Sequence, residues 1–390
     1  MKLKRLAALL LAMSMMFALA ACGNQANEES KAPENSTAVE ESKEPAGENT
    51  TEPTGGDEVK SVEGLTVAYI PKLTGNAFFE AANDGAQKYA KDWGITVEYM
   101  GDATASAAAQ VAVINDAVAK GVDAICISAV DAAGVSDALK EAAAAGIVIS
   151  TWDSDANPED RSLIVSQGTP EVLGQMLVDM SVAGLKDRGV DPDNDTVKYA
   201  WHYSQATVTD QNSWQVEGEK IIKEKYPNWE NVQPDNYYSE QDAEKSVTIG
   251  KAVLAAHADI DLIICNDSTA LPGQLEAAQQ AGLTKDDVTI TGFATPNAIK
   301  PYCTANILHN WGLWDCKVQG ALGCYVAAYI AAGNDVKVGD KIDVPGIGSV
   351  EVMANNCLNP DDTTADVNNG VVLLPERATF NAETMNNYDF

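Results

Sequence analysis

Short apolar segments alternate with longer helical segments along most of this 390-residue chain, and this alternation restricts the fold more than any other feature. A continuous run of Val, Ile and Leu is typical of a buried parallel strand, whereas apolar residues three and four positions apart indicate a helix. The expected strands are 65–70, 95–99, 123–128, 147–151 and 162–166, then 197–203, 232–238, 261–265 and 288–292. The expected helices are 76–93, 105–120, 132–145, 171–185, 211–226, 241–256, 269–281 and 312–332. This order predicts βαβ units, in which helices cover parallel sheets.

The pattern occurs in two successive series of similar length, without close internal sequence repetition. We therefore predict the α/β class, with two Rossmann-like doubly wound lobes joined by a hinge and separated by an interlobe cleft. Lobe 1 is expected to comprise 63–167 plus about 310–345, and lobe 2 to comprise 168–309 plus about 346–390. Ligands of such sheets bind beyond the carboxyl ends of the strands, so the cleft is the expected ligand site.

The chain begins with a segment typical of an exported protein. Three basic residues within the first five precede an apolar run from Leu6 to Ala20, which is short for a membrane span. The following Leu-Ala-Ala-Cys resembles a bacterial lipobox. Residues 1–22 are therefore expected to be a lipoprotein signal peptide, with Cys22 as the lipidated residue. The alternative is a signal peptide in which the cysteine is incidental.

Residues 23–62 are rich in Glu, Ser, Thr, Asn, Pro and Gly. Between Gly23 and Lys60 there are ten acidic and three basic residues and almost nothing apolar. Such a segment cannot bury enough surface to offset its ordering entropy, so we expect a disordered acidic tether. Together with a lipidated Cys22, it would hold the folded part at the outer face of the cell membrane.

The charge and the cysteine and histidine content exclude several classes of site. From residue 61 onward, 20 basic residues face 47 acidic ones, which disfavours nucleic acid because its binding requires Lys and Arg at phosphates. The seven cysteines lack metal-like spacing, and the three histidines form no ligand-spaced cluster. We therefore expect neither a metal nor a cofactor. The sequence leaves the pairing of the cysteines open.

Polar residues follow several expected strands at the ends that would face the cleft. They are Lys72 and Asp153 in lobe 1, and Asp210, Gln211, Asn266, Asp267 and Gln274 in lobe 2, where Pro272 offers its main chain. Carboxylates and amides accept hydrogen bonds from hydroxyls, and lysine and amide groups donate them, so the set suits a neutral polyhydroxylated ligand. Phe79 and Trp314 are candidate aromatic faces for such a ligand. Plainer interpretations are a solvated lysine, helix-capping aspartates and aromatic core residues.

Several separate blocks of sequence resemble the Lsr-type autoinducer-2-binding family. These blocks are Ala68-Tyr69-Ile70-Pro71-Lys72-Leu73, Thr151-Trp152-Asp153-Ser154-Asp155, Gln167-Gly168-Thr169-Pro170, Thr207-Val208-Thr209-Asp210-Gln211-Asn212, Gly312-Leu313-Trp314-Asp315, and Leu373-Leu374-Pro375-Glu376-Arg377 with the ending Tyr388-Asp389-Phe390. They occur in the family's order and span nearly all of 65–390. The chain is thereby similar to the type I periplasmic sugar-binding proteins, whose rhamnose-binding members share much of the pattern.

This resemblance implies a two-lobed, monomeric receptor that closes on a cyclic polyhydroxylated furanone hydrate and passes it to an ABC importer permease. The ligand contacts it implies are the side chains of Lys72, Asp153, Asp210 and Gln211, with main chain from Pro272. Where the family has a small residue, this chain has Gln274. A main-chain contact would tolerate that change, whereas an inward-turned side chain would narrow the pocket. The tether and lipobox are a second departure, because familiar members are free in a periplasm.

Four functions are thus open. The first is a non-enzymatic binding lipoprotein for autoinducer-2, and the second is a rhamnose or other monosaccharide receptor of the same kind. The third is a glycosidase that uses Asp153 and Asp210 as a carboxylate pair. The fourth is a sensor that presents its ligand to a membrane receptor. Asp155, which lies close to Asp153, is expected to shape its loop instead of binding ligand.

Overall fold

A computed structural model of the protein describes residues 59–360 and 370–390. The expected signal peptide, Cys22 and nearly all of the expected tether lie outside these residues. Within the described ranges, no helix is long and apolar enough to cross a membrane.

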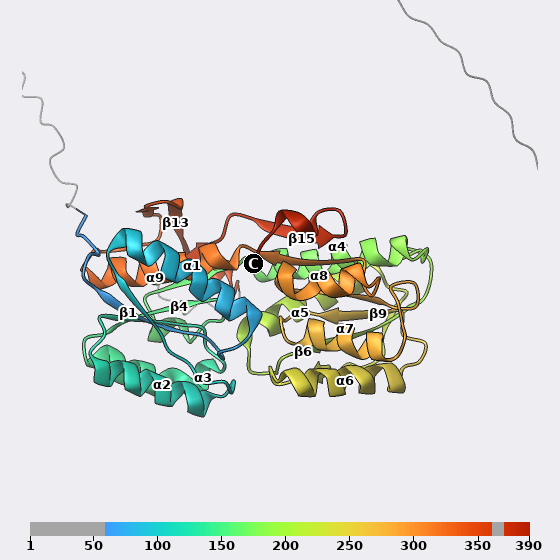
Figure 1. Cartoon of the computed structure of the whole chain (residues 1–390). Helices are drawn as coiled ribbons and strands as arrows, with labels where there is room; N and C mark the ends of the chain where they lie inside the picture. The colour runs from blue at the N-terminus through green and yellow to red at the C-terminus, as the bar shows by residue number, and fades with distance from the viewer. Residues whose placement is uncertain (1–58, 361–369) are drawn as a thin grey trace, which may run out of the picture. The chain divides into compact units, whose positions relative to one another are not determined.

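The first sheet has the expected parallel core. Its strands are β1 (Thr66–Ile70), β2 (Thr96–Tyr99), β3 (Ala124–Ile127), β4 (Val148–Trp152) and β5 (Leu163–Ser166), in the spatial order β2-β1-β3-β4-β5. The helices between them are α1 (Ala77–Trp93), α2 (Ala107–Lys120) and α3 (Ala132–Ala144), and the short turn η1 (Pro158–Asp160) precedes β5. In Figure 1, α1 lies on one side of this sheet and α2 and α3 on the other. Both faces of the sheet are therefore covered, as the apolar strands require.

The second sheet repeats this order. Its strands are β6 (Val197–Tyr203), β7 (Trp229–Asn231), β9 (Leu262–Cys265) and β10 (Thr289–Gly292), in the order β7-β6-β9-β10, and the short β8 (Tyr237–Tyr238) also pairs with β6. The helices are α4 (Pro170–Asp187), α5 (Thr209–Lys225), α6 (Ala243–Ala256), α7 (Ala270–Gln280) and α8 (Pro296–Thr304). Because β7-β6-β9-β10 matches β2-β1-β3-β4, the prediction of two doubly wound α/β lobes is confirmed.

The C-terminal quarter of the chain differs from the expected division. Its elements are β11 (Asn310–Trp314), α9 (Cys316–Ala331), β12 (Lys341–Val344), β13 (Gly348–Ala354), η2 (Asn355–Cys357), β14 (Gly370–Leu373), β15 (Arg377–Asn381) and η3 (Met385–Asn387). The sequence predicted one helix over 312–332, but its first residues form β11 instead. The strand β11 is fully buried and pairs antiparallel with β15. Its Gly312 also forms a β-bridge with Phe293 of the second lobe.

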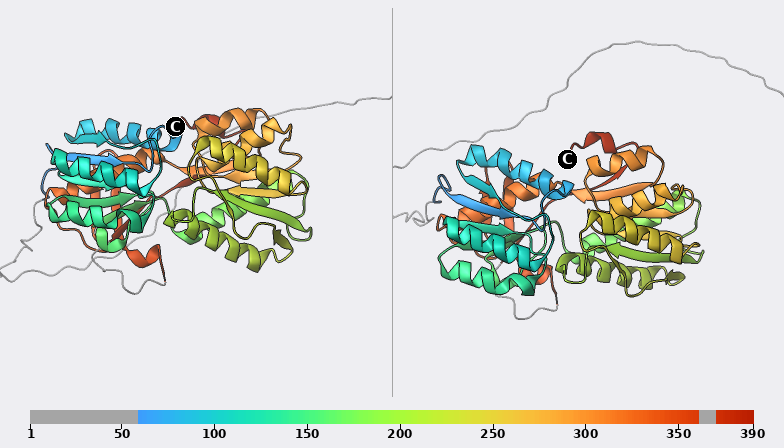
Figure 2. Two further views of the ribbon diagram at one scale, coloured as in Figure 1. Left: turned by 90° about the horizontal axis from the view of Figure 1, so that it is seen from below. Right: turned by 60° about the horizontal axis from the view of Figure 1, so that its bottom comes forward.

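The assignment of 346–390 to lobe 2 is wrong for β13 and β14. β14 pairs in parallel with β5, β13 pairs with β14, and β12 with β13, so all three extend the first sheet. The assignment of 310–345 to lobe 1 is likewise wrong for β11. The chain thus passes between the lobes after β5, after β11 and after β14, and Figure 2 shows these connections between the two halves. Short strands that complete existing sheets carry too weak a pattern to be assigned from sequence.

The helices α1 and α9 pack closely against each other. Asn76 caps α1 by accepting a hydrogen bond from the Phe78 N–H, and Asp315 caps α9 in the same way through the Val318 N–H. A Cβ atom at Gly85 would lie 2.1 Å from the Lys317 carbonyl oxygen. A Cβ atom at Gly320 would lie 2.2 Å from the Ala82 carbonyl oxygen. Glycine at both positions therefore allows α1 and α9 to approach closely.

Candidate functional site

The first lobe presents a buried ion pair at the carboxyl ends of its strands. Lys72 follows β1 and Asp153 follows β4, and the Lys72 Nζ lies 3.1 Å from the Asp153 Oδ2. Ser128, which follows β3, donates a 2.7 Å hydrogen bond to the same carboxylate oxygen. The side chains of Lys72 and Asp153 are only 2% and 5% exposed. The interpretation of Lys72 as a solvated loop lysine is therefore wrong.

Asp153 occupies an unusual backbone conformation. Its φ is 60°, in the left-handed region that most non-glycine residues avoid and that aspartate tolerates better than most. The preceding Trp152 is buried against Phe78, with their rings stacked 6.1 Å apart. This turn ends β4 and brings the Asp153 carboxylate beside Lys72. Asp155 pairs instead with Arg161 through two hydrogen bonds of 3.0 and 2.7 Å, which supports its expected role in shaping the loop.

The second lobe presents amides and a carboxylate at the ends of its own strands. Gln211, in the first turn of α5, accepts a hydrogen bond from the Ser204 hydroxyl through its side-chain oxygen. The Asn266 side-chain amide donates a 2.8 Å hydrogen bond to the Gln211 main-chain carbonyl. Asp267 accepts from the backbone N–H groups of Thr269 and Ala270 at 2.8 and 3.1 Å. The helix-capping interpretation of Asp267 is thus correct for one of its two oxygens.

These groups surround a small cavity of about 20 Å³. We call it the ligand cavity. Its first-lobe lining is Lys72, Phe78, Phe79 and Asp153; its second-lobe lining is Gln211, Trp214, Gln241, Asn266, Asp267, Ser268 and Phe293; Leu313 and Trp314 come from β11. Trp314 is at the centre of the aromatic part, with edge contacts to Phe78, Trp214 and Phe293 at 5.6 to 5.9 Å. Polar groups and aromatic faces therefore share one small space.

Three polar atoms of the second-lobe lining have no hydrogen-bond partner within 59–360 and 370–390. They are the Asn266 Oδ1, the Asp267 Oδ2 and the Gln241 Nε2. All three atoms are buried, and a buried polar atom without a partner costs about 1–3 kcal/mol. Two acceptors and one donor are the groups that a molecule carrying several hydroxyls would satisfy. The ligand cavity thus has the chemistry of a polyol site.

Burial and the neighbouring charges set the electrostatics of this site. Burial raises the pKa of Asp267 to about 6, against the opposing effect of its two backbone hydrogen bonds. Burial by itself would lower the pKa of Lys72, but the carboxylates of Asp153, Asp210 and Asp267 outweigh it, and the pKa is raised. Lys72 therefore stays charged. With Asp153 and Asp267 beside a single charged lysine in its lining, the ligand cavity disfavours an anionic ligand.

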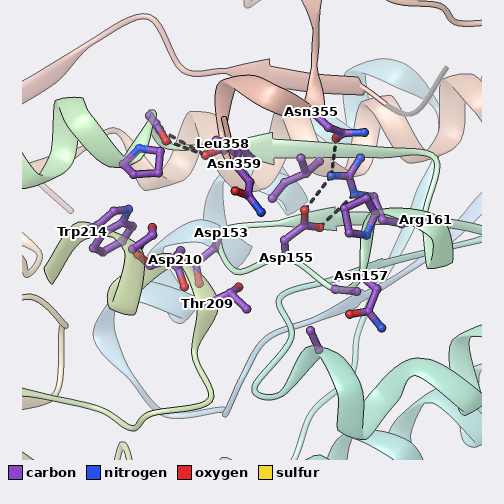
Figure 3. A pocket seen from close by; sticks show the side chains of 18 residues that line it. Asp153, Asp155, Asn157, Arg161, Thr209, Asp210, Trp214, Asn355, Leu358 and Asn359 are labelled. Carbon is purple, nitrogen blue, oxygen red and sulfur yellow. Dashed lines mark hydrogen bonds and ion pairs between the residues drawn. The ribbon is translucent and has the colours of Figure 1, made fainter. Parts of the chain in front are cut away.

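Asp210 lies outside the ligand cavity and borders a second one, shown in Figure 3, which we call the rear cavity. This space of about 380 Å³ lies between residues 153–161 of the first lobe and Thr209, Asp210, Ser213 and Trp214 of α5. The two Asp210 carboxylate oxygens accept hydrogen bonds from Ser154 at 2.5 Å and Gln167 at 3.0 Å. Asp153 and Trp214 border both cavities, so Asp210 sits directly behind the ligand cavity.

The structure does not bring Pro272 and Gln274 to the ligand cavity. Both residues lie within α7. The Gln274 Oε1 is 3.0 Å from the His202 Nδ1, and its amide donates to the Gly250 carbonyl at 3.3 Å. The Gln274 side chain is therefore turned away and does not narrow the cavity. Asn266 and Ser268, at the end of β9, occupy the wall instead.

Several lining residues escaped the sequence analysis. Gln241 lies between β8 and α6 with a φ of 55°, where no strand pattern marks a site. Trp214 and Phe293 have the spacing of ordinary core residues. Ser268 follows Asp267 directly, so the strand-end rule would have found it if extended by one residue.

Within the described ranges, no cluster of His, Cys, Asp or Glu is arranged to hold a metal ion. The six described cysteines are free thiols, and five of them are buried.

Comparison with known proteins identifies the family. A model described as a periplasmic binding protein domain matches residues 67–335. The solved structure of LsrB from Clostridium saccharobutylicum in complex with AI-2 is 66% identical, with a TM-score of 0.83, and the match covers 84% of this chain and 100% of that one.

More distant relatives share the fold. The ribose import binding protein RbsB of Salmonella typhimurium is 26% identical over 285 residues, which is 72% of this chain and 89% of that protein. A solute-binding protein from Clostridium phytofermentas with bound L-rhamnose is 23% identical, with a TM-score of 0.72, over 83% of this chain and 98% of that one. The chain belongs to the periplasmic binding protein family and, within it, groups with LsrB.

Proposed function

We propose that this protein is the substrate-binding component of an ABC importer and that it binds autoinducer-2, a cyclic polyhydroxylated furanone hydrate, in the ligand cavity. The unpartnered Asn266, Asp267 and Gln241 atoms facing the Lys72–Asp153 ion pair carry this proposal. The 66% identity with an LsrB that was solved with AI-2 supports the choice of ligand.

The proposed contacts come from both lobes. Lys72 donates to a ligand oxygen, while Asp153, Asp267 and the amides of Gln211 and Asn266 receive or donate hydrogen bonds at its hydroxyls. Aromatic rings cover the C–H side of the ring. Asp153, held in place by Lys72 and Ser128, acts in ligand binding, and Asp210 acts in closure.

Titration calorimetry with the purified full-length protein tests this proposal. Autoinducer-2 should give saturable heat, and the ligand recovered afterwards should be chemically unchanged. Heat with L-rhamnose or D-ribose but none with autoinducer-2 would make the protein a monosaccharide receptor. Turnover of an aryl glycoside would instead point to an enzyme.

We further propose that the protein acts as a lipid-anchored monomer at the outer face of the cell membrane. The leader ending in Leu-Ala-Ala-Cys and the acidic 23–62 segment support this location. Substitution of Cys22→Ser should release the protein from membranes into the medium. Wild-type protein that fractionates as soluble and carries no lipid would argue against the anchor.

A further inference from the structure

The three connections between the lobes meet at a hydrogen-bonded cluster. Gln167 lies in the first connection, Trp314 ends the strand before the second, and Arg377 begins the strand after the third. Arg377 donates from Nε to the Gln167 carbonyl at 2.7 Å and from Nη2 to the Leu374 carbonyl at 2.9 Å. The cluster therefore ties the first and third connections together directly.

A chain of side-chain hydrogen bonds runs from the ligand cavity through this cluster. The Trp314 Nε1 donates to the Gln319 Oε1 at 2.6 Å, and the Gln319 Nε2 donates to the Gln167 Oε1 at 2.9 Å. The Gln167 Nε2 then donates to the Asp210 Oδ2 at 3.0 Å. Trp314, Gln319 and Gln167 are at most 3% exposed. The path thus starts at the ligand-cavity wall and ends on α5 of the second lobe.

Asp210 joins this path to the first lobe. Its other carboxylate oxygen accepts the 2.5 Å hydrogen bond from Ser154, in the loop after β4. Ser154 and Asp210 therefore form a clasp between the lobes, as the position of Asp210 beside Asp153 in Figure 3 illustrates. The amide of Gln167 holds the carboxylate in the orientation that Ser154 requires, because one carboxylate plane serves both donors.

We propose that Gln167 is a positioning residue that couples the hinge to the clasp, so that the closed arrangement of the lobes depends on its amide. Gln319 belongs to α9 on the first sheet and Asp210 to α5 of the second lobe, so rotation at the first connection would break at least one of the two hydrogen bonds of the Gln167 amide, and the clasp would lose its orientation. The inference rests on the proposed function in one respect, which is that the ligand contacts Trp314 at the start of the hydrogen-bond path. Closure itself is measurable without ligand.

The test compares Gln167→Leu with wild type in the full-length protein by small-angle scattering, without ligand and with saturating autoinducer-2. Gln167→Leu preserves approximate size and removes the donor, so the ligand-free protein should become more extended. Ligand dissociation should accelerate about tenfold, with association changed less than about threefold, because closure mainly controls release. Gln175→Leu is the matched control, since its amide bonds Asp179 on the exposed surface of α4, and it should behave as wild type.

A second variant guards against misfolding. Gln319→Leu breaks the same path one step earlier and should reproduce both effects, and thermal unfolding of each variant shows that the fold persists. Equal scattering of Gln167→Leu and wild type in both conditions would overturn the inference. A ligand-free wild type that scatters as an equally extended particle as Gln167→Leu would also overturn it. Failure of the wild type to bind autoinducer-2 would overturn the proposed function but leave the ligand-free comparison intact.

Discussion

The two walls of the ligand cavity treat their polar groups differently. On the first-lobe wall, Lys72, Asp153 and Ser128 satisfy one another through contacts of 3.1 and 2.7 Å. On the second-lobe wall, Asn266 and Asp267 each leave one buried atom without a partner within the described residues. The first wall pairs its charges with each other before ligand arrives, whereas the second wall leaves buried atoms that only the ligand would satisfy. The ligand thus favours the arrangement in which both walls contact it, and this differential contact drives closure.

The largest loss of stability and of ligand affinity is expected at the Lys72–Asp153 ion pair of the first-lobe wall. Asp153→Ala leaves Lys72 as a buried charge without its ion-pair partner, and breaking a buried pair costs about 3–5 kcal/mol of stability. Autoinducer-2 binding should weaken by at least about 2 kcal/mol as well. Urea unfolding and titration calorimetry measure the two quantities. Glu98→Ala, which removes the exposed ion pair with Lys120, is the control and should cost less than about 1 kcal/mol.

The second-lobe wall should make binding depend on pH. Asp267 has a pKa of about 6 because it is buried, and ligand hydroxyls donating to its free oxygen would lower that pKa. Binding then releases a proton below pH 6, and affinity should fall about tenfold from pH 7 to pH 5. Calorimetry in buffers of different ionisation enthalpy measures the proton release. In Asp267→Asn the contribution of this carboxyl should vanish.

Stability of the ligand-free protein should move in the opposite direction. Burial raises the pKa values of Asp267 and Asp210 to about 6, above the ordinary value of 3.8 expected when unfolded. The folded state therefore binds more protons between these values, so the contribution of both carboxyls to stability rises as pH falls from 7 towards 4. Denaturant unfolding without ligand measures it. A ligand-free stability that rose from pH 5 to pH 7 in wild type, but not in the double Asn variant, would contradict this assignment.

A smaller effect distinguishes the walls directly. Gln241→Ala removes a donor that has no partner in the described structure, so ligand affinity should fall by about 1 kcal/mol with stability unchanged or slightly raised. Ser128→Ala removes a donor that Asp153 already uses, and it should cost stability even without ligand. Titration calorimetry measures the ligand affinity of the Gln241→Ala and Ser128→Ala variants, and thermal unfolding measures their stability. If Gln241→Ala and Ser128→Ala lost equal stability without ligand, the proposed difference between the two walls would be contradicted.

The smallest effect is expected at Gln274. Because its side chain faces His202 and Gly250, Gln274→Ala should change affinity less than about threefold, although stability falls. A large gain or loss of affinity at constant stability would mean that Gln274 turns into the ligand cavity.

Regular patterns made the lobes and the ends of their strands predictable. The apolar runs of β1 and β4 are enough to predict that Lys72 and Asp153 lie at one edge of a sheet, since side chains after parallel strands meet there. The same rule pointed to Asn266 and Asp267. It also pointed to Gln211, which lines the cavity, and to Asp210, which lies just behind it.

Other features depend on tertiary geometry that local sequence does not encode. Gln241 reaches the cavity from a left-handed turn, and Trp214 lies inward on a helix whose other face is exposed. The strands β13 and β14 join the first sheet only because β5 offers an open edge there. The Gln167 path connects residues more than 150 positions apart through buried amides, and no local pattern predicts such a contact.

A crystal structure of the protein with autoinducer-2 tests the central claim most directly. The account predicts one ligand in the ligand cavity, with its oxygens within hydrogen-bond distance of Lys72, Asp153, the Asn266 Oδ1, the Asp267 Oδ2 and the Gln241 Nε2. A ligand bound in the rear cavity, or one that left all three second-lobe atoms unpartnered, would contradict it.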